Sequence, residues 1–255
     1  MIATDKFVYV HMPKTGGTFV TEVLFRLQDL LNTEKLIIRN RRTAFILSEL
    51  KHGGYRDIPR AHRGKPLLTT IRNPFDLYVS EYEFGWWKRF EYRIYFRLLA
   101  GRYKKDFPGF PNLGFEEYLR LWNRAFCRGA NKDFDAPGSV GWLTHRFVEF
   151  YCPKPDDILR RLNGELVDSG TLKDEMADVA FLRTERLNED LHRYLLELGY
   201  GERDVEFIRG LTKIRPRGSG RGDEQGWSSY YTPELRRKLR SRERFIFEMF
   251  PEYDA

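Results

Sequence analysis

The sequence has few cysteines and no long apolar run. Its 255 residues include 2 cysteines, Cys127 and Cys152, which lie far apart and lack the spacing of metal ligands. This scarcity disfavours a disulfide framework and fits a reducing compartment. No apolar run reaches the roughly 18 residues that a transmembrane helix needs. The first residues, MIATDKFVYVH, carry no signal-peptide pattern, so we expect a cytoplasmic protein without a membrane partner.

The sequence also lacks internal repeats and low-complexity segments, and it is basic. Aromatic residues make up 15% and charged residues 32% of the chain, which is typical of a packed globular protein and excludes a disordered one. The formal net charge is +7. Such a charge is compatible with a nucleic acid, an acidic glycan, an anionic membrane surface, a polyanionic cofactor or simple solubility. Charge alone therefore selects no partner.

Segments of strand character alternate with segments of helical period. We predict strands at residues 6–12, 36–38, 66–71 and 179–183, and helices at residues 18–31, 43–51, 75–84, 140–151, 187–198 and 232–250. This alternation is typical of an α/β fold with a central, mostly parallel sheet flanked by helices. No linker separates the segments, so we expect one domain over residues 1–255. Residues 85–140 are predicted to form an insertion of helices and loops, and the glycine-rich residues 212–229 a mobile loop.

Residues 8–20 read VYVHMPKTGGTFV and have the composition of a loop that binds an anion. Backbone N–H groups of such a loop and of the first helical turn lack partners and face the ligand. The residues that we assign to this loop are Lys14, Thr15, Gly16, Gly17 and Thr18. The glycines allow close backbone approach, the lysine adds a charge, the threonines add hydroxyl donors, and Thr18 is also expected to cap the helix.

The order of residues in this loop disfavours a nucleoside triphosphate. The Walker A pattern places its lysine after the last glycine, whereas Lys14 precedes Gly16 and Gly17. A plain strand-to-helix turn with a surface lysine is the alternative interpretation.

A second motif follows the strand predicted at residues 66–71. It reads RNPFDLYVS from Arg72 to Ser80. Ligands of open α/β sheets bind at the carboxyl ends of the strands, so Arg72 is expected at the same sheet edge as Lys14. An arginine and a serine hydroxyl can hold a phosphate together. The alternative is a helix start at Asn73 and Pro74 with a surface serine.

The two motifs together resemble those of sulfotransferases that use 3′-phosphoadenosine 5′-phosphosulfate (PAPS). HMPKTGGT is similar to the 5′-phosphosulfate loop of the carbohydrate 2-O-sulfotransferase-like branch, roughly H-x-P-K-[TS]-G-[GS]-[TS]. RNPFDLYVS is similar to the family's 3′-phosphate motif, R-[DN]-P-x-x-R-x-x-S, and departs from it at Leu77, where the family has arginine. FLRTERLNEDLHRYLLELGY resembles a third family segment, and the matching residues are Glu185, Leu187, Asp190 and Gly199.

The resemblance implies a P-loop-like sulfotransferase fold and transfer of a sulfuryl group from PAPS to a hydroxyl acceptor, with PAP as product and no metal. Carbohydrate sulfation is the activity of the branch, so the expected acceptor is a sugar or a small metabolite. Lys14 is the candidate for stabilising charge on the leaving group. The insertion at residues 85–140 is expected to cover the acceptor cleft. Its aromatic residues could line that cleft or pack in the core: Trp86, Trp87, Phe90, Tyr92 and Tyr95.

The reaction also needs a general base, usually histidine or glutamate. His52 stands in KHGGYRDIP, which resembles a family segment, G-H-x-x-[YF], that carries the catalytic histidine. The match covers His52 and Tyr55, with Lys51 where glycine is frequent. The alternatives are a histidine that stabilises a helix C-terminus, or Glu34 as the base. His192 is expected on the surface, and His145 could line the acceptor cleft.

The basic segment KIRPRGSGRG contains two further candidates for the nucleotide site. Arg217 and Arg221 are expected to close over the 3′-phosphate. The rival interpretations of this segment are a nucleic-acid contact and a plain surface loop. For the whole chain, the alternatives are a small-molecule P-loop kinase and a non-catalytic nucleic-acid-binding protein. We expect no nucleic-acid partner, and the sequence makes no prediction of an oligomeric state.

Overall fold

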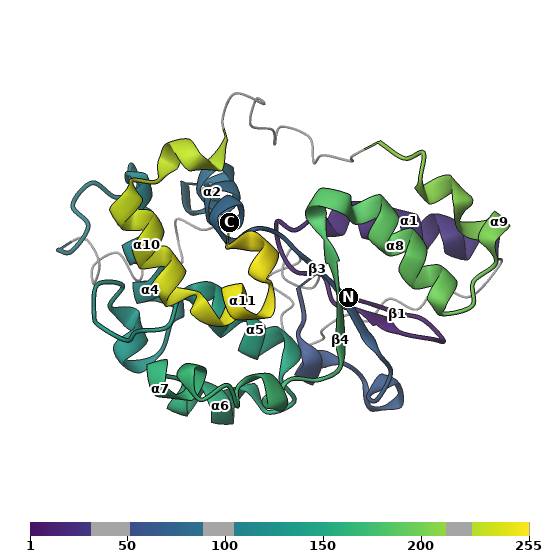
Figure 1. The fold of residues 1–255 in the computed structure, drawn as a ribbon, viewed down its shortest axis with the longest axis horizontal. Helices are drawn as coiled ribbons and strands as arrows, with labels where there is room; N and C mark the ends of the chain where they lie inside the picture. Colours follow the sequence, from purple (N-terminus) through teal and green to yellow (C-terminus); the bar gives the residue numbers. More distant parts are fainter. Residues whose placement is uncertain (32–51, 89–104, 213–225, 255) are drawn as a thin grey trace. The chain divides into compact units, whose positions relative to one another are not determined.

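The structure, a computed structural model, describes residues 1–31, 52–88, 105–212 and 226–254 (Figure 1). The strand predicted at residues 36–38 and the helix predicted at residues 43–51 lie outside these ranges. The chain divides into two compact units: unit 1 comprises Met1–Arg72, Glu149–Pro155 and Glu175–Gly220, and unit 2 comprises Asn73–Val148, Asp156–Asp174 and Arg221–Ala255. The single domain expected over residues 1–255 stays a prediction. None of the helices in the described ranges has the length and apolar character of a membrane-spanning segment.

Unit 1 contains the sheet. In the described residues its order is β1 (Ile2–Ala3), β2 (Val8–Tyr9), β3 (Leu67–Ile71) and β4 (Val179–Arg183). β1 pairs antiparallel with β2, whereas β2–β3 and β3–β4 are parallel pairs. The predicted α/β class and the mostly parallel sheet are therefore confirmed. β3 and β4 match their predicted ranges closely, β2 is shorter than the strand predicted at residues 6–12, and β1 was not predicted.

Two helices of unit 1 pack on one face of this sheet, α1 (Gly17–Leu30) and α8 (Leu187–Glu197). The short helix α9 (Glu202–Val205) adds to the same layer. Apolar residues at three- and four-residue spacing face the sheet from both helices. The buried helix residues of this core are Phe19, Val20, Val23, Leu24, Leu27, Leu187, Leu191 and Leu195. Each such residue contributes roughly 1.5–3 kcal/mol when fully buried, so this layer fixes the start of α1 against the sheet.

The helix assigned from sequence to residues 232–250 is in fact two helices of unit 2. α10 (Pro233–Arg242) ends at Glu243, and α11 (Arg244–Met249) begins directly after it. Unit 2 also contains all or most of α2 (Pro74–Phe84), α4 (Phe115–Phe126), α5 (Trp142–Tyr151), α6 (Pro155–Arg161) and α7 (Gly164–Asp168). The end of α5, from Glu149 on, and the first residue of α6 belong to unit 1. The break at Glu243 allows its carboxylate to enter the core of this unit.

The described part of the predicted insertion packs around buried aromatic rings. Trp87 is fully buried, and its ring centroid lies 4.8 Å from that of Tyr118 and 5.7 Å from that of Trp122 on α4. Trp87 therefore packs in the core, as the second of the two interpretations expected, and the interpretation that it lines an acceptor cleft is wrong. Phe90, Tyr92 and Tyr95, like the side chain of Trp86, lie outside the described part of the chain.

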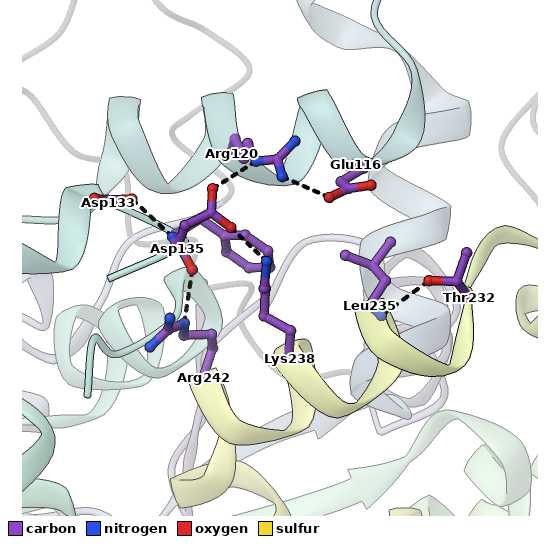
Figure 2. A network of polar contacts seen from close by, with 9 residues as sticks. Glu116, Arg120, Asp133, Asp135, Thr232, Leu235, Lys238 and Arg242 are labelled. Atoms are coloured by element: carbon purple, nitrogen blue, oxygen red, sulfur yellow. Dashed lines mark hydrogen bonds and ion pairs between the residues drawn. The ribbon is translucent and has the colours of Figure 1, made fainter. Parts of the chain in front are cut away.

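Figure 2 shows how α10 is tied to α4 within unit 2. The Asp135 carboxylate accepts hydrogen bonds from Arg120 on α4 at 2.8 Å and from Lys238 on α10 at 2.6 Å. Burial acts to raise the pKa of Asp135, but the hydrogen bonds from Lys238 and Arg120 lower it below its ordinary value. The Arg242 guanidinium binds the carbonyl of Phe134 at 2.9 Å. These basic residues of α10 thus bind groups of the protein itself.

Candidate functional site

The loop between β2 and α1 has an alternating backbone conformation. Lys14 has a φ of 60° and Gly16 a φ of 92°, whereas Thr15 between them and Gly17 after them have negative φ. Successive N–H groups in backbone of alternating hand form a concave surface that binds anions. A non-glycine residue in the left-handed region carries strain of about 1 kcal/mol or more. The surrounding contacts must therefore hold Lys14 in place.

Protein donors bind the carbonyl groups of this loop. Arg72 Nη1 donates to the Lys14 carbonyl at 3.2 Å, and Thr184 Oγ1 donates to the Thr15 carbonyl at 2.7 Å. The Gly16 carbonyl accepts the first hydrogen bond of α1, from the Phe19 N–H at 3.0 Å. In a trans peptide the N–H points opposite to the C=O. The N–H groups of the next residues, Thr15, Gly16 and Gly17, are therefore turned away from these donors, which is the arrangement that the predicted anion-binding loop requires.

Two expectations for the threonines of this loop are wrong. Thr15 is fully buried, and its hydroxyl donates to the Met12 carbonyl at 2.8 Å and lies 2.5 Å from Thr70 Oγ1. The Thr15 side chain thus fixes the loop to β3 through Thr70. Thr18 does not cap α1, because Gly16 is the N-cap residue and no side chain caps the helix. Thr18 is the second helical residue, whose N–H has no acceptor within a helix.

Gly16 and Gly17 each lie where a side chain would clash, but with different neighbouring residues. Gly16 has a positive φ, and a Cβ atom there would also lie 2.8 Å from Leu187 Cδ2. A Cβ atom on Gly17 would lie 2.1 Å from Cδ2 and 2.2 Å from Nε2 of His11. Gly17 thus makes room for the His11 imidazole, a reason that the sequence did not indicate.

The His11 ring in turn contacts His52. The two ring centroids are 4.8 Å apart with an edge-to-face angle of 83°. His52 Nδ1 lies 2.9 Å from the His11 carbonyl oxygen. A carbonyl oxygen only accepts hydrogen bonds, so Nδ1 carries the proton, and in the neutral ring the lone pair is on Nε2. The structure therefore holds His52 in the tautomer that a general base requires.

We predict that Gly17→Ala displaces the His11 ring and disturbs His52. The added methyl group has no space, so the variant should lose about 1–3 kcal/mol of unfolding free energy and show shifted His52 imidazole resonances by NMR. Gly210→Ala is the matched control, since a Cβ atom at Gly210 meets only the Phe207 carbonyl oxygen at 4.0 Å. A Gly17→Ala protein with the stability and the His52 resonances of the wild type would contradict this prediction.

The described residues bring together part of the predicted site. Arg72 directly follows β3 and its Nη1 donates to the Lys14 carbonyl, so its expected place at the same sheet edge as Lys14 is confirmed. Ser80 lies on α2 in unit 2, and its pairing with Arg72 stays a prediction. Arg217, Arg221 and the alternative base Glu34 lie outside the described residues. The loop, His52, Arg72 and Thr184 all belong to unit 1.

The structure also corrects the interpretation of two other histidines. His192 is buried, with Nε2 at 3.6 Å from a Glu206 carboxylate oxygen, so its expected place on the surface is wrong. His145 is buried as well, and its Nδ1 lies 2.9 Å from the Gly141 carbonyl, while Nε2 lies 3.4 Å from the Arg128 N–H. Both ring nitrogens of His145 contact the backbone, so it has a structural role and does not line an acceptor cleft.

A comparison with protein-family models finds no match to this chain, and neither does a comparison with curated proteins. Among solved structures, the chain is similar to mouse sulfotransferase SULT7A1 complexed with PAP, with a TM-score of 0.41 and 16% sequence identity over 92% of this chain and 82% of that chain.

Proposed function

We propose that this protein is a PAPS-dependent sulfotransferase that transfers a sulfuryl group to a hydroxyl acceptor. The observation that carries the proposal is the loop at residues 14–17, whose carbonyl groups are bound by Arg72, Thr184 and the Phe19 N–H. The consecutive N–H groups that remain suit the phosphate oxygens of a phosphosulfate. Lys14 adds a positive charge to this loop, although it precedes the glycines and so does not follow the Walker A order.

The proposed reaction is an in-line displacement at sulfur. The acceptor oxygen forms a bond to sulfur as the bond from sulfur to the bridging oxygen breaks, and the electron pair of that bond stays on PAP. The acceptor proton passes to Nε2 of His52, the nitrogen left unprotonated by the Nδ1 contact with the His11 carbonyl. Lys14 and the loop N–H groups stabilise the charge that develops on the leaving phosphate.

The first experiment compares ligands by thermal shift, because at equal concentration a ligand that binds the folded state more tightly stabilises it more. PAP should raise the unfolding temperature strongly, whereas AMP and ATP with Mg²⁺ should raise it little. Stronger stabilisation by ATP with Mg²⁺ would favour the small-molecule kinase. Salt-sensitive binding of RNA or DNA without a preference for PAP would favour the nucleic-acid-binding protein.

We predict that Lys14→Ala weakens PAP binding about tenfold to a hundredfold, because a charge-assisted contact contributes roughly 1.5–3 kcal/mol. Turnover should fall as well, since the same charge acts on the leaving group. Isothermal titration with PAP measures the binding effect. Lys132→Ala, at an exposed position of unit 2, is the control. Unchanged PAP affinity in Lys14→Ala would remove this lysine from the site.

The acceptor class is the finer part of the proposal. We propose a sugar or small-metabolite hydroxyl, and this rests on the similarity of HMPKTGGT and of the His52 segment to the carbohydrate 2-O-sulfotransferase-like branch. Transfer of labelled sulfate from PAPS to a panel of monosaccharides, glycan oligomers and small alcohols tests it. Labelling of small alcohols alone would exclude the carbohydrate branch while leaving the sulfuryl transfer in place.

A further inference from the structure

Thr184 occupies a position where three parallel strands end. It is the first residue after β4. Its hydroxyl oxygen lies 2.7 Å from the carbonyl oxygen of Thr15, in the loop after β2, and 2.9 Å from that of Ile71, the last residue of β3. One side chain thus contacts the carboxyl ends of β3 and β4 and the loop that follows β2.

The turn that carries Thr184 is itself fixed by a buried carboxylate. Asp190 is 1% exposed and accepts a hydrogen bond from the Arg183 N–H at 2.9 Å. Arg186 and Arg193 bind the second oxygen of Asp190 at 3.1 Å and 3.0 Å. A buried carboxylate with this many donors keeps a defined position. The Thr184 hydroxyl is therefore held on a rigid support rather than on a free loop.

The contact with Thr15 has a consequence for the next peptide group. The C=O of Thr15 and the N–H of Gly16 belong to one planar trans peptide, so fixing the carbonyl also fixes the direction of the N–H. Gly16 has a φ of 92°, and a glycine at such a position is free to adopt other conformations unless its neighbours prevent it. The Thr184 methyl group contributes to this restraint, because Cγ2 lies 3.7 Å from the position of a Cβ atom on Gly16.

We propose that Thr184 is a positioning residue that orients the Gly16 N–H toward the 5′-phosphate group of the nucleotide. The proposal rests on the proposed function, because that function places a 5′-phosphate at this loop. Thr184 acts on the ligand only through the Thr15–Gly16 peptide and does not itself contact the phosphate. Its hydroxyl is the essential group, so serine should replace threonine and valine should not.

The test uses Thr184→Val and Thr184→Ser in the full chain, with two nucleotides that differ at the 5′ position. PAP carries a 5′-phosphate, and adenosine 3′-monophosphate does not. We expect Thr184→Val to bind PAP about tenfold more weakly, to bind adenosine 3′-monophosphate as the wild type does, and Thr184→Ser to match the wild type for both. Equal losses for both nucleotides would indicate general damage to the fold and would overturn the proposal, as would wild-type PAP affinity in Thr184→Val.

A second measurement needs no ligand. Hydrogen exchange at the amides of residues 15–17 should be faster in Thr184→Val than in the wild type and unchanged in Thr171→Val, where the lost contact joins Thr171 to Ser169 on the surface of unit 2. If exchange is faster in Thr184→Val but the wild type binds no PAP, the proposed function is contradicted, whereas the restraint of the loop by Thr184 is supported. Unchanged exchange would overturn the restraint. If Thr184→Val does not fold, Thr184→Cys replaces it, since a thiol is a weaker donor.

Discussion

Turnover by His52→Ala is expected to be about 10²- to 10⁴-fold slower than by the wild type, while the affinity for PAP stays the same. The reason is the contact of His52 Nδ1 with the His11 carbonyl at 2.9 Å, which leaves the lone pair on Nε2 to accept the proton of the acceptor hydroxyl. In the proposed site the loop amides and Lys14 hold the charge of the phosphosulfate, so we expect PAP binding not to depend on the imidazole. Steady-state kinetics and isothermal titration separate the two effects.

His52→Asn tests the role of His52 as a proton acceptor separately from its hydrogen bond to the His11 carbonyl. The asparagine amide can donate to the His11 carbonyl as Nδ1 does, but it cannot accept a proton, so this variant should be as slow as His52→Ala. His62→Ala is the control, because His62 lies at the other end of β3, five residues before the strand. A His52→Ala enzyme near the wild-type rate would show that the base is another residue.

The parts of the fold that could be predicted are those with strong local signals. β3 and β4 are short segments rich in apolar and β-branched residues, a pattern typical of strands inside a parallel sheet. The start of α2 was visible in Asn73 and Pro74, and the Asn73 side chain indeed accepts the Phe75 N–H at 2.9 Å. β1 escaped prediction because a two-residue strand has no period, and its pairing with β2 depends on the turn between them.

The site was predictable as a set of loop residues but not as an arrangement. Lys14, Gly16 and Arg72 are candidates because their types and order match an anion loop and a strand end. The residues that hold them are far away in sequence and ordinary in type: the Thr70 hydroxyl meets Thr15, and Thr184 meets the Thr15 carbonyl. No local pattern distinguishes such a threonine from one on the surface. The sequence therefore predicted an anion-binding loop, and the structure supplied the contacts that orient its backbone.

Glu243 is a similar case in unit 2, where sequence period alone predicted one helix through this position. The residue is fully buried. Its carboxylate accepts hydrogen bonds from the N–H groups of Leu143 at 2.8 Å and Thr144 at 2.9 Å, at the start of α5, and from the Thr144 hydroxyl at 2.7 Å. The Tyr78 hydroxyl from α2 donates to the same group. A single carboxylate thus joins the α10–α11 break to two other helices.

Gly141 provides the space for this carboxylate. A Cβ atom there would lie 2.1 Å from Glu243 Oε1. The position is also favourable for a negative charge, because the N-terminus of a helix carries a partial positive charge. The break between α10 and α11 at Glu243 and the glycine before α5 therefore both allow the same contact, between the Glu243 carboxylate and the start of α5. This contact joins residues about 100 positions apart in the sequence.

Glu243→Ala is accordingly expected to lower the free energy of unfolding of unit 2 by about 3 kcal/mol, because two backbone N–H groups and two hydroxyl groups lose a buried acceptor. All 5 tryptophans of the chain lie in unit 2, so urea unfolding followed by tryptophan fluorescence measures this unit. Glu248→Ala, at an exposed position of α11, should change the value by less than about 0.5 kcal/mol. A Glu243→Ala protein as stable as Glu248→Ala would show that the buried contacts contribute little.

Glu243 is also expected to make the unfolding free energy of unit 2 depend on pH, and the direction of this dependence follows from its pKa. Burial raises the pKa of Glu243, an effect that the hydrogen bonds from Tyr78, Thr144 and Leu143 offset only in part. A carboxyl group with a raised folded pKa binds its proton more tightly in the folded state, so its contribution to stability is present below the ordinary pKa of glutamate, about 4.3, and is lost as pH rises through the folded value. The unfolding free energy of the wild type should fall over this window, and that of Glu243→Gln, which cannot ionise, should lack this fall. Equal slopes in the two proteins would place the titration on another group.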